Sequence, residues 1–310
     1  MSAAWTLDDL PDQTGRTAVV TGATGGLGEQ VALELARRGA TVVLAARSEA
    51  RLEASRARLV AQVPGADVRL LRVDLSDLGE VRRAAGEAAG LGAVHLLVNN
   101  AGVMATASTR TPDGLDLQMA TNHFGHFLLT GLLFPQLLAG SGRVVSVSSN
   151  AHRAARQAPL GDPRVPERRY SRWGVYAQSK LANLLFTYEL EHRLRAARLP
   201  VQAMAAHPGY SATHLLATGQ TGRAAGGAAS ILNAVMRATA QSAHMGALPI
   251  LMAASADLPG GSYCGPGGLQ QWRGLPQLVT SSDLAHDRSA QARLWGISED
   301  VTQLRYPRSS

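Results

Sequence analysis

Tyr176 and Lys180 are the residues whose types and spacing point most directly to chemistry in this 310-residue chain. They are four positions apart, so on a helix they would share a face and lie one turn from each other. Lys180 is the only lysine in the sequence, because the other 29 basic residues are arginines. A nearby ammonium stabilises a phenolate and lowers the pKa of the tyrosine, which would let Tyr176 donate a proton near neutral pH. The same spacing also arises by accident on helices, so the pair alone leaves both interpretations open.

Apolar strands that alternate with helices must position this pair. Thr17–Thr21 is a short β-branched strand, and a glycine-rich turn and a helix that ends near Gly39 follow it. Further strands are predicted at 41–46, 68–73, 94–98, 144–148 and 201–205. Further helices are predicted at about 49–61, 77–89, 115–138, 175–197 and 283–296.

This alternation predicts an α/β fold with one doubly wound Rossmann-type domain over residues 1–310. Its central parallel sheet should have about seven strands, with helices on both faces. Residues 1–15 are interpreted as a polar lead-in. Residues 150–172 are rich in arginine and proline and are interpreted as an inserted loop, whereas residues 210–245 are interpreted as a cover over the site.

The turn after the first strand carries Gly22, Gly26 and Gly28, and it opens a helix. Glycines there let backbone N–H groups approach a pyrophosphate at the positive end of the helix. The spacing is not that of a P-loop, in which a lysine and a hydroxyl residue follow the last glycine. A tight turn can also need glycines for packing alone. The loop residues predicted to contact a dinucleotide are Gly22, Thr24, Gly25, Gly26, Leu27 and Gly28.

The end of the second strand bears on the choice of dinucleotide. An NAD(H) site usually has an acidic residue there for the ribose 2′-hydroxyl. This chain has Arg47 instead, whose guanidinium suits a 2′-phosphate. NADP(H) is therefore favoured over NAD(H), and the alternative is that Arg47 is a solvated surface residue.

Bulk composition narrows the functional class. The formal charge of +7 invites a nucleic-acid hypothesis, but the arginines are spread along the chain and only 5% of residues are aromatic. No nucleic-acid partner is expected. The single cysteine, Cys264, excludes an intramolecular disulfide and a cysteine-based zinc site. His123 and His126 have helical spacing but no third ligand nearby, so no metal is expected. An acidic N-terminal stretch and the absence of a long apolar run predict a cytoplasmic protein without a membrane span.

Taken together, these motifs resemble the short-chain dehydrogenase/reductase family over residues of about 15 to 300, and within it the retinol-dehydrogenase-like and protochlorophyllide-reductase-like branch. The motifs that carry the resemblance are Thr21–Gly28, Asp74–Leu75, Asn99–Gly102, Asn122, Val147–Ser149, Tyr176–Lys180 and Pro208–Thr213. Single motifs of this kind are weak, but seven in the family's order are specific. One departure is that Tyr176 lies 27 positions after Ser149, a larger gap than most members have. Because the loop at 150–172 is inserted between Ser149 and Tyr176, the expected oligomeric state is a monomer or a homodimer.

The resemblance implies a role for each matching position. The catalytic set would be Asn122, Ser149, Tyr176 and Lys180, and Ser148 competes with Ser149 for its place. Cofactor contacts would come from the glycine loop, from Tyr176 and Lys180, and from Arg47, Asp74, Leu75, Asn99, Ala101, Gly102, Pro208, Gly209, Ser211 and Thr213. Asn122 would hold a water that supplies protons to Lys180.

The predicted function is an NADP(H)-dependent oxidoreductase that interconverts a carbonyl and an alcohol on a fairly apolar small molecule. Tyr176 would be the general acid or base, and Ser149 would donate a hydrogen bond to the oxygen on which charge grows. Two alternatives stay open: a redox sensor that binds NADP(H) without turnover, and a C=C reductase of the same family.

Overall fold

The computed structural model describes residues 5–164, 169–209 and 241–307, and one mixed sheet organises them. Its strand order is β3-β2-β1-β4-β5-β6-β7-β8. The strands are β1 (Thr17–Thr21), β2 (Thr41–Ala46), β3 (Val68–Arg72), β4 (Leu96–Asn99), β5 (Arg143–Val147), β6 (Gln202–Ala206), β7 (Tyr263–Pro266) and β8 (Pro276–Leu278). The first seven run parallel, and β8 pairs antiparallel with β7. The predicted doubly wound parallel sheet is confirmed, with one antiparallel strand added at its edge.

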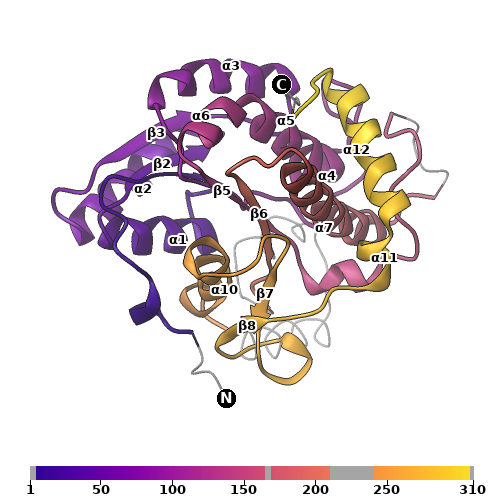
Figure 1. The fold of residues 1–310 in the computed structure, drawn as a ribbon. Coiled ribbons are helices and arrows are strands. Elements are labelled where there is room, and N and C mark those ends of the chain that lie inside the picture. The colour runs from indigo at the N-terminus through magenta and orange to yellow at the C-terminus, as the bar shows by residue number, and fades with distance from the viewer. Residues whose placement is uncertain (1–4, 165–168, 210–240, 308–310) are drawn as a thin grey trace, which may run out of the picture.

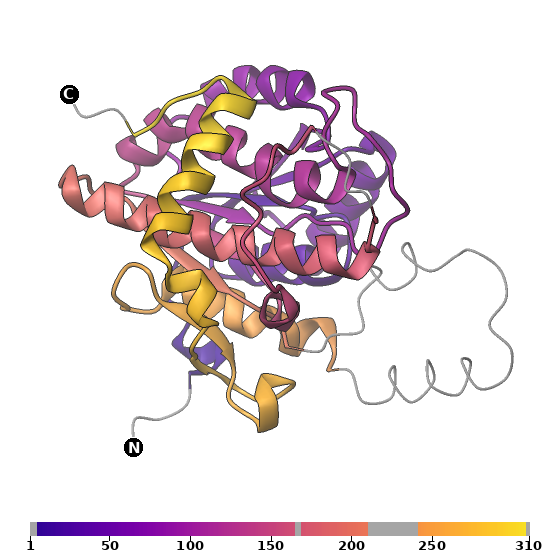
Figure 2. The same ribbon diagram turned by 90° about the vertical axis from the view of Figure 1, so that its right-hand side faces the viewer.

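Helices cover both faces of the sheet (Figures 1 and 2). One face carries α1 (Gly26–Arg37), α2 (Glu49–Gln62) and α10 (Ala243–Ser255). The other carries α3 (Leu78–Ala88), α5 (Gly125–Leu132) and α7 (Arg172–Ala196), and α12 (Arg288–Thr302) packs on the outside of α7. The shorter helices are α4 (Leu117–Met119), α6 (Phe134–Ala139) and α11 (Asp283–His286).

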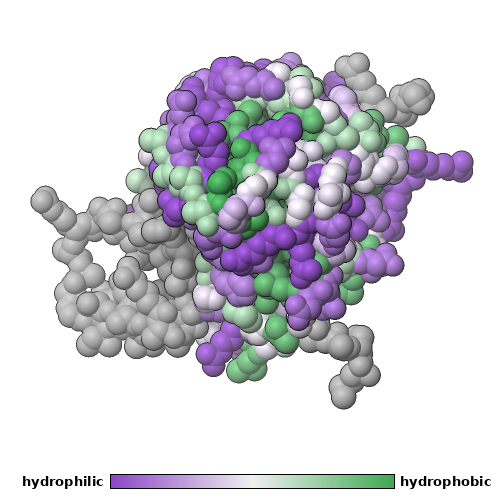
Figure 3. All heavy atoms as spheres, turned by 90° about the vertical axis from the view of Figure 1, so that its left-hand side faces the viewer, coloured by the Kyte–Doolittle hydropathy of each residue, from purple (hydrophilic) through white to green (hydrophobic). Residues whose placement is uncertain are grey.

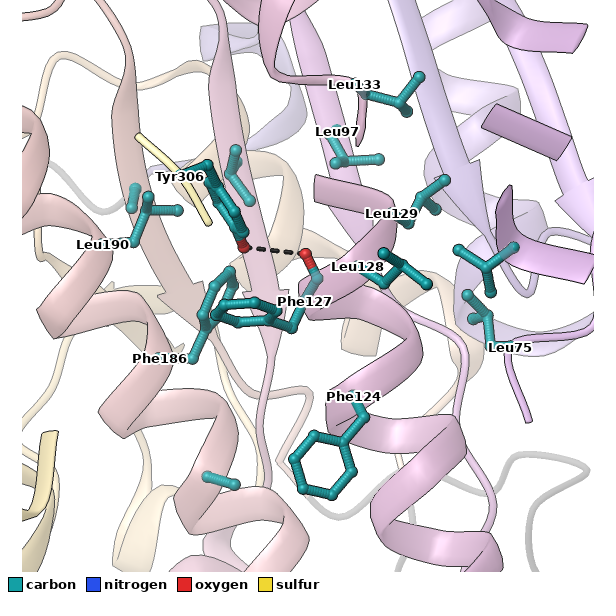
Figure 4. Packing of buried hydrophobic residues seen from close by; sticks show 14 of the residues in the cluster. Leu75, Leu97, Phe124, Phe127, Leu128, Leu129, Leu133, Phe186, Leu190 and Tyr306 are labelled. Atoms are coloured by element: carbon teal, nitrogen blue, oxygen red, sulfur yellow. Dashed lines mark hydrogen bonds between the residues drawn. The ribbon is translucent and has the colours of Figure 1, made fainter. Parts of the chain in front are cut away.

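Alternate residues along the strands pack into two separate hydrophobic cores, one on each face of the sheet. Val19 and Leu97 point into the core under α3, α5 and α7, whereas Val20 and Val98 point into the core under α1 and α10. Figure 4 shows the first core between α5 and α7, where the ring of Phe127 packs among other aromatic side chains. The hydroxyl of Tyr306 donates to the Phe127 carbonyl at 2.9 Å, so the C-terminal segment is fastened to α5.

The free edge of the sheet at β3 carries charged residues. Arg69 and Arg72 are exposed there, and they pair with Asp67 and Glu80 respectively. Charges on an edge strand discourage pairing with another chain. Figure 3 shows this side of the molecule, on which hydrophilic residues predominate and hydrophobic residues appear in smaller patches.

Two predicted helices are interrupted. Instead of the single helix expected at 115–138, the chain forms α4, a π-helical turn η3 (Ala120–Phe124), α5 and α6 in succession. Helix α6 begins as a new helix after Leu133, because Pro135 has no N–H to continue the helical hydrogen bonds of α5. The expected helix at 283–296 is α11 followed by α12. Asp287 separates these two and caps the second, since its carboxylate accepts from the N–H groups of Ser289 and Ala290.

The region after β6 was predicted least well. Helix α10 is apolar on all sides and contains Pro249, so it shows no amphipathic period. Strands β7 and β8 are short and rich in glycine and proline, and sequence analysis missed them. Most of the predicted cover over 210–245 and part of the inserted loop, residues 165–168, lie outside the described residues. None of the helices in the described part of the chain is both long and apolar enough to cross a membrane.

Candidate active site

A cavity of about 690 Å³ opens at the carboxyl ends of β1 to β6. The strand order reverses between β1 and β4, and open parallel sheets bind ligands at such a reversal. Much of the wall is built from residues that follow each strand in turn. These are residues 22 and 24–27 after β1, 47–48 after β2, 73–75 after β3, 100–104 after β4, 148–151 after β5 and 208–209 after β6.

The glycine loop has the geometry that its sequence predicted. Gly22 and Gly26 have φ angles of 67° and 58°, the left-handed region that glycine adopts without strain. A methyl group added at Gly28 would lie 2.5 Å from the carbonyl oxygen of Gly22, so this glycine allows the loop to fold over the start of α1. The side chain of Asn100 ties the loop to β4, because its Nδ2 donates to the Thr21 carbonyl at 2.8 Å.

Two arginines line the cavity beyond β2. Arg47 is exposed, and it makes no hydrogen bond or ion pair with the other described residues. Arg51, in the first turn of α2, also lines the cavity and donates to the Thr24 carbonyl at 3.2 Å. On the neighbouring strand end, Asp74 accepts hydrogen bonds from the backbone and hydroxyl of Ser76. This end of the cavity therefore presents two guanidinium groups and one carboxyl group.

Ser149, Tyr176 and Lys180 all line the same cavity. Ser149 follows β5, and the other two lie one turn apart on α7. The Lys180 ammonium is buried, donates to the Val147 carbonyl at 3.1 Å and lies 5.8 Å from the centre of the Tyr176 ring. The structure thus brings together three of the four predicted catalytic residues around one space.

The pKa of Tyr176 differs from the sequence-based expectation. Burial raises it to about 12, and a hydrogen bond with Ser149 opposes this rise. Burial also lowers the pKa of Lys180 to about 8. The predicted lowering of the tyrosine pKa is wrong for this structure, in which burial of the phenol raises that pKa instead. A buried phenol that stays protonated at neutral pH is still suited to donating a proton.

The two neighbouring serines have different surroundings. The hydroxyl of Ser148 is buried and donates to the Lys180 carbonyl at 2.8 Å, so it fastens β5 to α7. The Ser149 hydroxyl instead accepts from the Ala151 N–H at 3.2 Å and lines the cavity, where it favours a lower pKa of Tyr176. Ser149 is held in place by His152, whose ring donates from Nδ1 to the Ser149 carbonyl while Nε2 accepts from the Ser282 N–H.

Asn122 lies in the π-helical turn and is fully buried. Its amide oxygen accepts from the Val103 N–H, and its Nδ2 donates to the Val103 carbonyl and to Ser179. A π-turn widens a helix by one residue and is frequent at functional sites. Asn122 lies behind the cavity wall, where it fixes the segment after β4 against α7.

Comparisons with known proteins bear on what this cavity is for. A model of the short chain dehydrogenase family matches residues 16–161. The chain is also 40% identical over 203 residues to retinol dehydrogenase 13 from Homo sapiens. The chain belongs to the short-chain dehydrogenase/reductase family. Within it, the similarity is to the retinol-dehydrogenase-like branch.

Two further relatives extend the comparison of this short-chain dehydrogenase. It is 42% identical over 212 residues to polyprenol dehydrogenase from Mus musculus. The matched stretches cover 65% of this chain and 60% of retinol dehydrogenase 13, and 66% of this chain and 63% of polyprenol dehydrogenase, so the chain spans less than two thirds of either relative. The crystal structure of an uncharacterised protein from Mycobacterium Paratuberculosis is 44% identical and superposes with a TM-score of 0.81 over 99% of this chain and 100% of that one.

Some predicted contacts of the short-chain dehydrogenase lie elsewhere. Asn99 does not line the cavity, because its Nδ2 donates to Thr130 on α5, and its neighbour Asn100 lines the cavity instead. Gly28 also lies behind the wall, since its contacts are with Gly22 and Asn100. Ser211 and Thr213 lie outside the described residues. The remaining predicted contacts line the cavity: Gly22, Thr24, Gly25, Gly26, Leu27, Arg47, Asp74, Leu75, Ala101, Gly102, Tyr176, Lys180, Pro208 and Gly209.

The arginines of the inserted loop stay away from the cavity. None of the five that the structure describes, Arg153, Arg156, Arg164, Arg169 and Arg172, lines it. Sequence analysis missed Arg51, Asn100, Trp173 and Trp272, which do line it. A positional signal existed for Arg51, which lies one turn after Arg47, and for Trp173, which lies three residues before Tyr176. Trp272 had none, because its position depends on a hairpin formed late in the chain.

Proposed function

We propose that this short-chain dehydrogenase interconverts a carbonyl and an alcohol on a fairly apolar small molecule with NADP(H) as its cofactor. The observation that carries the proposal is the meeting of Ser149, Tyr176 and Lys180 in the cavity that the glycine loop opens. Retinol and polyprenols, which give their names to two relatives, are alcohols with long apolar bodies. Apart from Lys180, the residues nearest Tyr176 in the cavity lining, Ser149 and Trp173, carry no charge, which is compatible with a substrate of that kind.

The chain's own residues supply the proton and the electrostatic part of the reaction. The nicotinamide, when bound, supplies or takes up the hydride. Tyr176 gives its phenolic proton to the oxygen of the carbonyl as negative charge develops there. Ser149 donates a hydrogen bond to the same oxygen, and the Lys180 ammonium stabilises the resulting phenolate. Asn122 acts as a positioning residue, since it holds the backbone at Val103, and the preceding Gly102 lies close to Lys180.

The cavity wall suits a phosphorylated dinucleotide. The positive φ angles of Gly22 and Gly26 let the loop turn tightly into the start of α1, and α1 contributes the positive end of its dipole. Arg47 and Arg51 provide two guanidinium groups where a 2′-phosphate on the adenosine ribose would lie. Asp74 and Leu75 line the cavity beside them and would flank the adenine.

Replacement of Arg47 by alanine should change the choice of cofactor. We expect the apparent KM for NADPH to rise about tenfold or more, because a charge-assisted hydrogen bond to phosphate is lost, while that for NADH changes little. Steady-state kinetics with each cofactor measure this. Arg56→Ala is the matched control, since Arg56 is likewise an exposed arginine but lies within α2, pairs with Glu53 and does not line the cavity. Equal effects on both cofactors would argue against a phosphate contact.

The reaction itself is tested by product identification. The purified protein should oxidise NADPH when an apolar aldehyde or ketone is added, and chromatography should show the corresponding alcohol as the product. With an α,β-unsaturated ketone, a saturated ketone as the main product would indicate C=C reduction instead. Tight NADPH binding without oxidation across a broad carbonyl panel would favour a redox sensor.

As part of the same proposal, the enzyme acts in the cytoplasm as a monomer or homodimer.

A further inference from the structure

Two tryptophans line the cavity although much of each side chain faces solvent. Trp173 is 49% exposed and Trp272 is 58% exposed. Of the large apolar side chains that are exposed in the described part of the chain, only these two are also cavity residues. A residue that meets both solvent and cavity lies at the cavity's opening. We call this pair the aromatic mouth.

Trp173 is held next to the candidate acid. It is the second residue of α7, whose first turn is capped by the Ser171 side chain. Its ring meets that of Tyr176 edge-on, with centroids 6.2 Å apart and planes 82° from parallel. An indole in this position borders the space in which the reacting carbonyl must lie.

Trp272 is presented by a constrained turn between β7 and β8. The two residues before it, Gln270 and Gln271, have φ angles of 52° and 58°, a conformation that side-chain-bearing residues rarely adopt. Such backbone persists only where its surroundings enforce it, and it is often found at ligand sites. The enforcing contacts come from Asn150, whose Nδ2 donates to the carbonyls of both glutamines.

A second anchor links this turn to the end of β6. The Gly209 N–H donates to Nδ1 of His207, so the other ring nitrogen carries the proton and donates to the Gln271 side chain at 3.1 Å. Burial lowers the pKa of His207 to about 3, which keeps the ring neutral. A methyl group on Gly209 would lie 2.4 Å from the Trp272 carbonyl oxygen, so the two segments are in close contact.

The lining near the aromatic mouth carries little charge. Within the part of the chain that the structure describes, the uncharged side chains that line the same cavity include Met104, Leu117, Thr121, Asn150 and Ala151. The acidic and basic side chains of the cavity are Lys180, which is already assigned, Arg47 and Asp74, which follow β2 and β3, and Arg51 in α2. A substrate here would be neutral, and its contacts would be with aromatic faces and apolar groups.

We propose that the aromatic mouth selects substrates whose carbonyl is attached to a flat aromatic or conjugated group. The inference rests on the proposed function, which places the carbonyl at Tyr176. Stacking of an indole ring on a flat π-system contributes more binding free energy than the buried apolar area alone predicts. A puckered saturated ring cannot lie flat against an indole. Trp173 and Trp272 are thus specificity-determining residues that position the body of the substrate, and Tyr176 acts on its carbonyl.

Equilibrium binding tests this without turnover. Calorimetric titration in the presence of NADP⁺ would compare 2-acetylnaphthalene with its fully saturated decalin counterpart, since a ketone cannot be oxidised further. We expect the wild type to bind the flat ketone about tenfold more tightly. Trp173→Leu and Trp272→Leu should each reduce that preference about fivefold and keep the fold, because leucine preserves an apolar side chain at a half-exposed position.

The matched control is Leu269→Ala. Leu269 lies in the same turn and is 88% exposed but does not line the cavity, so its loss should leave the preference unchanged. Equal affinity for the two ketones, no measurable binding of either, or a preference that survives in the double tryptophan variant would each overturn the inference. Because no turnover is needed, failure of the carbonyl-reduction proposal would show separately, as absent NADPH oxidation beside an intact binding preference.

Discussion

Tyr176→Phe should lower kcat/KM for carbonyl reduction by about 10²–10⁴-fold, the usual contribution of a positioned general acid. The substitution removes only the phenolic O–H, so the ring contacts with Trp173 remain. Binding of NADPH should change little, since the cavity wall keeps its shape. Initial rates of NADPH oxidation and a fluorescence titration of the cofactor would measure the two quantities.

Tyr188→Phe provides the matched control. Tyr188 also lies on α7, and its hydroxyl hydrogen-bonds to Ser281 away from the cavity. Loss of this O–H should leave turnover unaffected. Full turnover by Tyr176→Phe on a substrate that the wild type reduces would contradict the proposed chemistry.

Lys180→Arg should lose most activity, on the order of 100-fold, while the protein still folds. The ammonium occupies a buried space that a planar guanidinium does not match. Kinetic constants together with a thermal unfolding curve would separate loss of activity from loss of fold. Wild-type activity in this variant would mean that the charge alone is enough.

The pH dependence of stability gives Lys180 a second test. Its pKa is about 8 in the fold and close to 10.5 when unfolded. Between these values the unfolded chain binds more protons, so Lys180 makes the free energy of unfolding rise with pH. Tyr176 has the opposite effect from about pH 10 to 12, because its pKa is raised. Lys180→Met should therefore flatten the rise between pH 8 and 10.5 in denaturant titrations. An unchanged slope would show that this lysine is not buried as described.

The sequence was most informative where local chemistry decides the structure. The glycine loop was predicted because positive φ angles at Gly22 and Gly26 need glycine, whatever surrounds them. The pairing of Tyr176 with Lys180 on α7 was predicted because helical spacing alone places them one turn apart. The strands β1 to β6 were found because buried parallel strands are continuous apolar runs.

Contacts between distant segments were harder to predict. Asn99 and Asn100 are adjacent, and only the pleat of β4 decides which of them reaches the cavity. Ser148 and Ser149 are distinguished by the carbonyl of Lys180, which lies 32 residues from Ser148 in sequence. A lowered pKa of Tyr176 beside Lys180 is the expectation for two groups in water, whereas burial raises the pKa of the phenol and lowers that of the ammonium.

The sequence by itself determined the family, the sheet of alternating strands and helices, and the three residues that meet around the proposed proton transfer. These features follow from backbone preferences and from periodicities that are written into neighbouring residues. Tertiary structure alone decided that Trp272 joins Trp173 at the cavity opening. Asn150 and His207 hydrogen-bond to the turn that carries Trp272, and each is more than 60 residues away from it in the sequence. A pattern among neighbouring residues cannot predict contacts of that kind.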